Sequence, residues 1–364
     1  MALSWIIAGG GTGGHVTPAL ALGEVIADRG DSLLFIGSDQ GLEARLVPEA
    51  GFELITLPSQ QVMGRSLIGK LSGGFRILTQ VGRAHAILRE RRADVVVSVG
   101  GFAAMPAALA ALLLRRPLVL VEPNAIPGRV NRLTARFARR VFMGFADAAA
   151  YLKGGSRLQH VGIPLRQKLT QAFASKETRQ APRSPLHLLV FGGSQGAHQI
   201  NEAMIAIASE LAQLPIQIFH QTGQADLSAV REAYAQARVS AEVVEFERDM
   251  PSRYLWADLA ISRAGALTVA ELAMAGLPAL LIPYPFAADD HQAANAEALS
   301  KAGAALRLDS RPLNPERLVE EIRTLQENPG QLIAMSQAAT TRAQPDAARK
   351  IIEETAAALQ ENAE

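Results

Sequence analysis

The chain has 364 residues, 49% of them apolar, and a net charge of +1, which suits two globular domains. It contains no cysteine, so disulfide bonds, thiolate metal sites and cysteine nucleophiles are excluded. The longest apolar stretch, residues 102–114, is shorter than the ~20 residues that cross a bilayer. Residues 1–163 carry +7 and residues 164–364 carry −6. This asymmetry indicates an anionic surface or partner for the first half, unless the charges are scattered solvated residues.

The first strand-to-helix junction is a glycine cluster. The apolar run Trp5–Ala8 leads into five glycines within residues 9–14, and an Ala/Leu-rich pattern predicts a helix over residues 18–27. Glycines adopt positive φ and let a ligand approach the backbone closely. A strand, a glycine turn and a helix together present backbone N–H groups to an anion.

The first half continues as alternating strands and helices. Apolar β-branched runs predict buried parallel strands at residues 33–36, 95–99 and 118–121, with a weaker candidate at 141–145. The segments 100–102 and 122–124 follow two of these strands. Ligands of open α/β sheets bind beyond the carboxyl ends of strands. Both segments are therefore candidate ligand loops, with plain strand–helix turns as the alternative.

The stretch 65–92 interleaves apolar residues with Lys and Arg, and residues 129–140 add five arginines. Apolar side chains rimmed by basic ones favour binding to an anionic membrane surface without spanning it. An ordinary amphipathic helix packed on a sheet is the alternative reading of residues 65–92. Nucleic-acid binding is not expected, because aromatic residues are sparse and no reader motif occurs.

The second half repeats the organisation of the first. Residues 162–185, with a short helix from about residue 164, form the inter-domain region. The strand 186–191 leads into a second glycine turn, residues 192–197, and a helix from about residue 199. Further strands are predicted at 216–219, 243–246, 259–262 and 279–282. The last helix begins near Pro345.

The chemistry of the glycine turns has two readings. Residues 9–14 formally fit a dinucleotide fingerprint, but Gly37 and Ser38 separate the second strand from Asp39, the nearest carboxylate for a ribose. An NAD dehydrogenase is thus a weak alternative, and it leaves the second turn unexplained. The other reading places a nucleotide diphosphate on the second turn, at the N-terminus of a helix, with Glu271 available for the ribose diol. Such a site suits sugar transfer, because the departing diphosphate is stabilised where its charge develops.

Seven motifs in order give a more specific result. They are Gly10-Gly11-Thr12-Gly13-Gly14-His15-Val16 with Pro18, Gly100-Gly101-Phe102, Glu122-x-Asn124-Ala125, Gly162-x-Pro164-x-Arg166, Gly192-Gly193-Ser194-x-Gly196-Ala197, Arg263-x-Gly265-Ala266-Leu267-Thr268-Val269-x-Glu271 and His291-Gln292-x-x-Asn295. From about residue 5 to the last helix, the chain resembles the MurG family of bacterial transferases. That family adds N-acetylglucosamine to lipid I in peptidoglycan synthesis.

The resemblance implies an α/β chain with the GT-B fold, two Rossmann-like parallel-sheet domains facing a deep cleft. An acceptor and membrane-binding domain would comprise residues 1–163 with the returning helix in 343–364, and a UDP-sugar domain residues 164–342. It implies an inverting transfer from UDP-N-acetylglucosamine to the C4 hydroxyl of N-acetylmuramic acid in lipid I. The location would be peripheral, at the cytoplasmic face of the inner membrane.

Donor-binding residues follow by motif position. Ser194 would meet the diphosphate, Glu271 the ribose and Gln292 the sugar, while the backbone near Glu247 would read uracil. The nucleotide would be lined by Ala266, Leu267, Thr268, Val269 and Ala270. As the cleft closes, the donor would also be contacted by Thr12, Gly13, Gly14, Asn124 and Arg166.

Inversion needs a base to take the proton of the attacking hydroxyl. His15 is the first candidate, with a phosphate-binding or helix-capping role as its alternative, and Glu122 is the second. His198 and His291 are interpreted as binding or structural. The adjacent Asp289, Asp290 and His291 make a poor metal cage. The resemblance implies no metal-ligating acidic dyad, so no bound metal or cofactor is expected.

Two positions depart from the family pattern, and several functions stay open. Phe102 stands where the family often has Tyr, and Pro123 where it often has Gln, which removes two hydrogen bonds from the proposed acceptor region. The alternatives are a UDP-N-acetylglucosamine 2-epimerase on the same fold, a related transferase with another lipid or natural-product acceptor, and the dehydrogenase. A non-catalytic binding module is disfavoured, since both halves of a two-substrate site are present.

Overall fold

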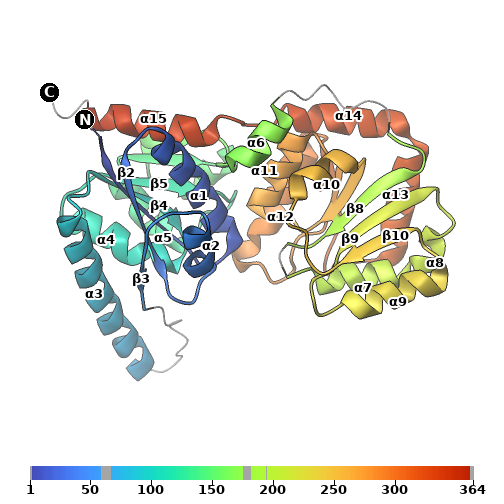
Figure 1. The fold of residues 1–364 in the computed structure, drawn as a ribbon, viewed down its shortest axis with the longest axis horizontal. Helices are drawn as coiled ribbons and strands as arrows, with labels where there is room; N and C mark the ends of the chain where they lie inside the picture. The colour runs from blue at the N-terminus through green and yellow to red at the C-terminus, as the bar shows by residue number, and fades with distance from the viewer. Residues whose placement is uncertain (1, 59–66, 175–181, 194, 361–364) are drawn as a thin grey trace. The chain divides into compact units, whose positions relative to one another are not determined.

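The chain divides into two compact units. The computed structural model describes residues 2–58, 67–174, 182–193 and 195–360, without the side chains of 67–77 (Figure 1). Unit 1 comprises residues 1–167 and 344–364, and unit 2 comprises residues 168–343. Residues 164–167 belong to unit 1 because the Arg166 side chain and the Gln167 backbone N–H both bond the Glu24 carboxylate.

Unit 1 is built on one parallel sheet of seven strands. Their order is β3-β2-β1-β4-β5-β6-β7. Ile6 of the first strand pairs with Leu34 on one side and Val96 on the other, which sets the register at the centre. The strands are β1 (Ser4–Gly9), β2 (Ser32–Ser38), β3 (Leu54–Leu57), β4 (Val95–Gly100), β5 (Leu118–Glu122), β6 (Arg140–Met143) and β7 (Leu158–His160).

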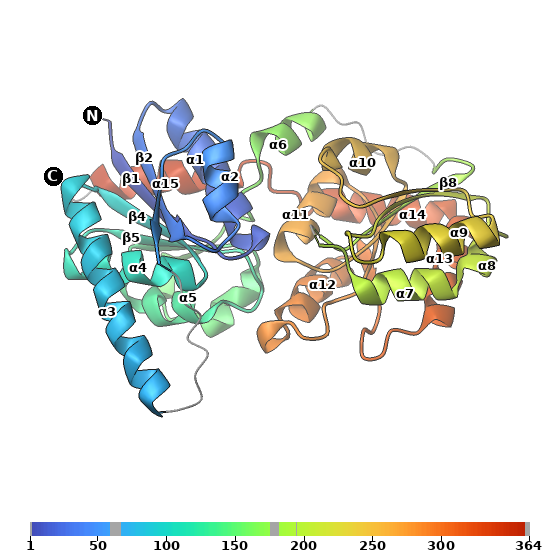
Figure 2. The same cartoon turned by 60° about the horizontal axis from the view of Figure 1, so that its bottom comes forward.

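Alternate side chains of this sheet enter two separate cores. Ile6 and Ala8 face α3 (Leu67–Glu90) and α4 (Met105–Leu113), whereas Trp5 and Ile7 face α1 (Gly13–Asp28), α2 (Glu43–Glu49) and α15 (Ala347–Gln360). Figure 2 shows α3 and α4 on one side of the sheet. Parallel strands buried on both faces are expected to be apolar throughout, as these are. A further short helix, α5 (Arg129–Thr134), follows β5.

Unit 2 repeats this topology with six parallel strands. Their order is β10-β9-β8-β11-β12-β13, so each unit has its first strand beside its fourth. The strands are β8 (Leu186–Phe191), β9 (Ile216–Gln221), β10 (Ala241–Val244), β11 (Leu259–Ser262), β12 (Ala279–Leu281) and β13 (Ala305–Arg307).

The helices of unit 2 pack on both faces of its sheet. Ile200, Val230 and Ile322 join Val190 and Ile261 in one core, while Tyr254 packs edge-on against Phe191. The helices are α6 (Gln167–Phe173), α7 (His198–Ala206), α8 (Ala208–Leu211), α9 (Leu227–Ala237), α10 (Met250–Trp256), α11 (Ala266–Ala275), α12 (His291–Lys301), α13 (Pro315–Glu327) and α14 (Pro329–Thr340). The 3-10 turns of the chain are Phe102–Ala104, Ala135–Phe137, Ala146–Tyr151, Gly155–Arg157 and Ala288–Asp290.

The two Rossmann-like sheets are confirmed, and some predicted boundaries are wrong. The first helix begins at Gly13 rather than near residue 18, so two glycines of the cluster form its first turn. Strand β10 ends at Val244, and Phe246 lies outside it and is exposed. The strands β3, β7 and β13 were not predicted; they are short and half-buried, and each pairs with a single neighbour.

The C-terminal part of α3 is an ordinary packed helix. Val81, Ala84 and Leu88 are buried against the sheet and α4, whereas Leu78 is exposed. The residues 59–66 lie outside the described part of the chain. In that described part, no helix is both long and apolar enough to cross a membrane.

Candidate active site

The strand orders place the two glycine turns at equivalent positions. In each sheet, the second and third strands lie on one side of the first strand, and the fourth and later strands lie on the other side. The strand order therefore switches between β1 and β4 in unit 1, and between β8 and β11 in unit 2. Such a switch point is where open α/β sheets bind ligands, beyond the carboxyl ends of the strands. The first glycine turn follows β1, and the second follows β8.

His15 lies where the β1 and β4 loops of unit 1 meet. Its Nδ1 is 3.3 Å from the Thr12 hydroxyl. A Cβ added to Gly101, whose φ is +79°, would lie 2.6 Å from the Gly10 carbonyl oxygen and 3.6 Å from His15 Nδ1. Only glycine therefore allows the two loops to approach this closely.

Gly13 and Gly14 are the first two residues of α1, and Thr12 is its N-cap. The first N–H groups of a helix have no acceptor within the helix and carry the positive end of its dipole. The predicted donor contacts Thr12, Gly13 and Gly14 thus lie together at an anion-binding helix end beside His15.

Glu122 is buried and held by four hydrogen bonds. Its Oε1 accepts from the Asn124 backbone N–H at 2.9 Å and from the Asn124 side-chain amide at 3.4 Å, and its Oε2 accepts from the Gly128 N–H at 3.0 Å and from Asn131 Nδ2 at 2.9 Å. Burial raises the pKa of the Glu122 carboxyl, while these bonds act in the opposite direction. The carboxylate organises the loop 123–128 and places Asn124.

Arg166 is already paired within unit 1. Its Nε bonds Glu24 of α1 at 2.5 Å, and the other Glu24 oxygen accepts the Gln167 N–H at 2.9 Å. The guanidinium is thus held near the chain's exit from unit 1.

The second glycine turn contains Ser194, which lies outside the described residues, so its diphosphate role is not described structurally. Around it, Gly193 has φ +94°, and its carbonyl accepts from the Gln221 side-chain amide at 2.6 Å. A Cβ on Gly196 would lie 1.7 Å from the Thr222 carbonyl oxygen, so this turn is pressed against the backbone that follows β9. The turn ends at Ala197, where α7 begins.

The segment 266–271 forms the first part of α11. Thr268 and Glu271 are one helical turn apart, as predicted, with Ala266, Leu267, Val269 and Ala270 around them. Tyr254 donates to Glu271 Oε2 at 2.7 Å. Burial raises the pKa of Glu271 to about 7, against the Tyr254 hydrogen bond, which lowers it.

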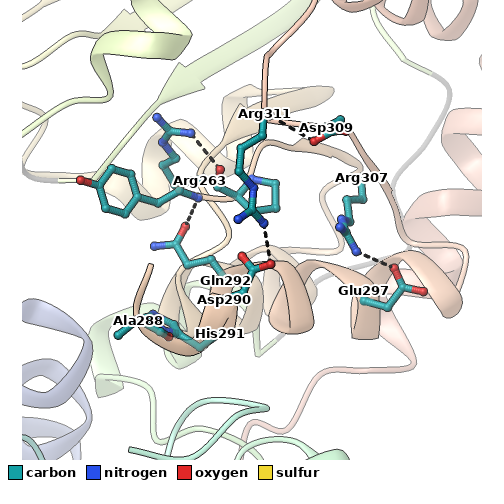
Figure 3. Close-up of polar contacts among 11 residues, drawn as sticks. Arg263, Ala288, Asp290, His291, Gln292, Glu297, Arg307, Asp309 and Arg311 are labelled. Carbon is teal, nitrogen blue, oxygen red and sulfur yellow. Dashed lines mark hydrogen bonds and ion pairs between the residues drawn. The ribbon is translucent and has the colours of Figure 1, made fainter. Parts of the chain in front are cut away.

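A buried arginine supports the sugar-binding candidate Gln292. Arg263 Nη1 donates to the Gln199 side chain and to the carbonyls of Ile282 and Pro283. The Tyr284 N–H that follows donates to Gln292 Oε1 at 2.9 Å (Figure 3). Burial lowers the pKa of Arg263 to about 10, so the group stays charged at neutral pH.

Glu247 is bound by its own loop. Its carboxylate accepts from the Asp249 N–H at 2.7 Å and from Arg253 Nε at 2.6 Å, which fixes the backbone predicted to read uracil. These bonds lower the pKa of Glu247 although its burial acts the other way. In the residues that the structure describes, no three His, Asp or Glu side chains gather as metal ligands.

Comparisons with known proteins agree with this architecture. Residues 5–143 match the glycosyltransferase family 28 N-terminal domain, and residues 187–351 match the family's C-terminal domain. The chain belongs to glycosyltransferase family 28. It is 44% identical, over 96% of both chains, to the UDP-N-acetylglucosamine–N-acetylmuramyl-(pentapeptide) pyrophosphoryl-undecaprenol N-acetylglucosamine transferase of Acidithiobacillus ferrooxidans.

Solved structures of related proteins share this fold. The crystal structure of Acinetobacter baumannii MurG has a TM-score of 0.81 at 32% identity, covering 96% of this chain and 98% of that one. The resemblance to the MurG family and the GT-B fold that it implies are thereby confirmed. The UDP-N-acetylglucosamine 2-epimerase of Neisseria meningitidis shares only the fold, with a TM-score of 0.64 at 14% identity over 97% and 99% of the two chains.

Sequence reasoning missed several groups that hold the site residues. Glu24, Glu43, Gln221 and Tyr254 were not singled out, and Arg263 was quoted in a motif without a role. Their partners are distant in sequence: Glu24 is 142 residues from Arg166, and Tyr254 is 17 residues from Glu271. These pairs form only where α1 meets the segment before α6 and where α10 packs beside α11, which the local sequence does not show.

Proposed function

We propose that this chain transfers N-acetylglucosamine from UDP-N-acetylglucosamine to the C4 hydroxyl of N-acetylmuramic acid in lipid I, which yields lipid II for peptidoglycan synthesis. The near-full-length identity of 44% to a transferase of that name carries this proposal. The glycine turns at both switch points support it, because a nucleotide diphosphate and a second substrate each need a loop at a strand's carboxyl end.

The donor would bind unit 2. Its diphosphate would lie at the second glycine turn with Ser194, its ribose at Glu271, its uracil at the backbone near Glu247 and its sugar at Gln292. The remaining donor contacts would be Ala266 to Ala270 of α11, with Thr12, Gly13, Gly14, Asn124 and Arg166 from unit 1. The proposed site needs neither a metal nor a cofactor.

In the reaction, the acceptor C4 oxygen forms a bond to C1 of the donor sugar while the bond from C1 to the UDP oxygen breaks. The configuration at C1 inverts, and the negative charge passes to UDP. We assign the base to His15, whose ring lies at the edge of both unit 1 loops. Glu122 is the weaker candidate, because its carboxylate already accepts hydrogen bonds from Asn124, Gly128 and Asn131.

The protein would act at the membrane that holds lipid I, as a peripheral protein at the cytoplasmic face of the inner membrane. Leu133 and Phe137 are exposed in the segment 129–140, beside Arg132 and Arg136, whose guanidinium groups stack on Tyr151 and Phe137. Apolar side chains with attached cations suit an anionic lipid surface. The stretch 65–92 would contribute a second contact, of which Leu78 is exposed.

Release of UDP from UDP-N-acetylglucosamine, with and without a lipid I analogue, tests the proposal. We expect analogue-dependent release and a β-linked disaccharide product, and no release with an analogue that lacks the C4 hydroxyl. UDP release without analogue, accompanied by free sugar, would indicate the epimerase or simple hydrolysis instead. Absence of UDP-N-acetylglucosamine binding would overturn the donor assignment.

A further inference from the structure

We infer that Glu43 is a positioning residue for the transfer reaction: its buried carboxylate occupies the first glycine turn as an internal anion and fixes the loop that carries His15. This inference rests on the proposed function, because that function places Thr12 to His15 at the reacting groups. The evidence is the set of contacts around one side chain.

The Glu43 carboxylate binds the backbone at the carboxyl ends of two neighbouring strands. Its Oε2 accepts the Gly11 N–H at 2.8 Å, and its Oε1 accepts both the Ser38 N–H and the Ser38 hydroxyl at 2.7 Å. Gly11 follows β1, and Ser38 is the last residue of β2. The carboxylate therefore ties the first glycine turn to the neighbouring strand through three hydrogen bonds, which are strong because the acceptor is charged.

The surrounding glycines leave room only for this carboxylate. A Cβ on Gly10 would lie 2.0 Å from Glu43 Oε1, and a Cβ on Gly37 would lie 2.5 Å from Glu43 Cγ. The Glu43 side chain is 1% exposed. Gly10, one of the glycines that the sequence offers for a ligand, and Gly37 of β2 thus admit a side chain of the protein itself.

The second glycine turn is held by the opposite kind of contact. Gly11 and Gly193 are each the second residue after their strand and have nearly the same φ, +92° and +94°. Gly11 donates its N–H to the carboxylate of Glu43, whereas Gly193 accepts through its carbonyl from the neutral amide of Gln221. The first turn therefore already holds an anion, while the second turn has none among these contacts.

Fixing Gly11 fixes the residues after it. Thr12 caps α1, its carbonyl accepts the N–H groups of His15 and Val16 at 3.1 Å, and its hydroxyl contacts the His15 ring. A displaced Gly11 would shift this cap and the imidazole together. Displacement of a catalytic group by about 1 Å lowers turnover by up to about a hundredfold.

The test is Glu43→Gln, which keeps the shape but places an amide NH2 against either the Gly11 N–H or the Ser38 N–H. We expect kcat to fall at least tenfold and amide hydrogen exchange of residues 11–16 to accelerate, while the exchange of unit 2 stays unchanged. Glu49→Gln, an exposed carboxylate on the same helix, is the matched control and should behave as the unmodified protein.

Glu43→Asp gives a second, independent reading if the Gln variant fails to fold. It keeps the charge but is one methylene shorter, so it reaches only one of the two strands' ends, and we expect an intermediate kcat. A Gln or Asp variant with unchanged kcat and unchanged exchange of residues 11–16 overturns the inference. Failure of the unmodified protein to release UDP would count against the proposed function alone, because the exchange measurement does not depend on turnover.

Discussion

The phenol of Tyr254 donates a 2.7 Å hydrogen bond to the carboxylate of Glu271, from a helix that precedes Glu271's own helix on the sheet of unit 2. Tyr254 is buried and Glu271 is half-buried, so their hydrogen bond offsets part of the cost of removing the two polar groups from water. Burial raises the pKa of both, and the hydrogen bond draws the Glu271 pKa back toward its ordinary value. Tyr254 thereby lowers the pKa of the proposed ribose acceptor against the larger effect of burial.

Tyr254→Phe removes that hydrogen bond and leaves the ring. We expect the affinity for UDP-N-acetylglucosamine at pH 7 to fall by roughly three- to tenfold, because the net value of such a bond is about 1 kcal/mol. Titration calorimetry at pH 7 and pH 9 measures this, and the loss should shrink at pH 9, where Glu271 ionises without help. Tyr234→Phe, which removes a buried hydroxyl bonded to His220, is the control. An equal loss at both pH values would contradict the mechanism.

Donor affinity should also depend on pH in the unmodified protein. A Glu271 pKa of about 7 means that the carboxylate is mostly protonated at pH 6 and mostly ionised at pH 8. Since the ionised form is the better acceptor for the ribose hydroxyls, the affinity for UDP-N-acetylglucosamine should rise about tenfold over this interval. Glu271→Gln should bind weakly with no such rise. A flat profile in the unmodified protein would show that Glu271 does not contact the ribose as a carboxylate.

His15 and Glu122 should differ in kind when they are replaced. His15→Ala should lower kcat by about 10²- to 10⁴-fold without changing the affinity for UDP-N-acetylglucosamine by more than about threefold. Glu122→Gln should instead lower the thermal unfolding midpoint, since one N–H in its loop then faces an amide NH2, at a cost of about 1–3 kcal/mol. Steady-state kinetics and thermal unfolding of both variants separate the roles. A base role for Glu122 would be shown by a large fall in kcat at unchanged stability.

The buried His220 makes unit 2 sensitive to acid. Its ring lies between Tyr234 and Asn201, and burial lowers its pKa to about 3. The unfolded chain takes up a proton near pH 6.5 that the folded chain refuses, so this group's contribution is complete above pH 6.5 and lost as the pH falls toward 3. The cost is about 1.4 kcal/mol per pH unit below 6.5.

Urea unfolding measures this effect in a protein that carries Trp5→Phe. Its remaining tryptophan is Trp256, so tryptophan fluorescence then reports the unfolding of unit 2. His220→Gln should be less stable at pH 7 but should lose less stability between pH 6.5 and pH 4.5. If both proteins lose stability at the same rate, protonation of another group sets the acid limit of unit 2.

The segment 129–140 should bind anionic lipid. Leu133 and Phe137 are 62% and 54% exposed, and replacing both by Asp removes apolar area and adds repulsion. We expect at least a fivefold loss of cosedimentation with vesicles of phosphatidylglycerol and phosphatidylethanolamine, and little change in donor affinity. Leu255→Asp, at an exposed leucine of unit 2, is the control. Equal losses in the two variants would mean that the segment 129–140 is not a specific site of lipid binding.

The sequence predicts best the strands whose own residues form a continuous apolar run. Strands β8 and β11 are buried on both faces and read as continuous apolar runs, so their bounds are as predicted. The edge strand β10 has no fully buried residue, so its apolar pattern is weak, which explains its misplaced end. Gly13 and Gly14 favour a turn by propensity, but their place in the first turn of α1 costs little, because N–H groups there need no partner within the helix.

The side chains that hold the site could not be predicted in the same way. Glu43 is one of many charged residues, and the pattern around it, an exposed-looking helix start, gives no sign that it is buried. Its role appears only when β1 and β2 pair and bring Gly10, Gly37 and Ser38 around one carboxylate. The family resemblance predicts roles for the motif positions Thr12, Glu271 and Gln292 and these roles stay predictions, whereas their supporting residues are found only in the folded chain.

The helix α15 belongs to unit 1 although it follows all of unit 2 in the chain. Ile351, Ile352 and Ala356 enter the same core as Trp5 and Leu20, and α15 runs along α1 (Figure 1). During synthesis, the ribosome must therefore complete unit 2 before the core of unit 1 can close. Until then, an apolar strip on α1 and β1 is left uncovered and open to chaperones or to aggregation. A fragment that ends at residue 167 would retain that strip permanently, so unit 1 matures last even though its chain emerges first.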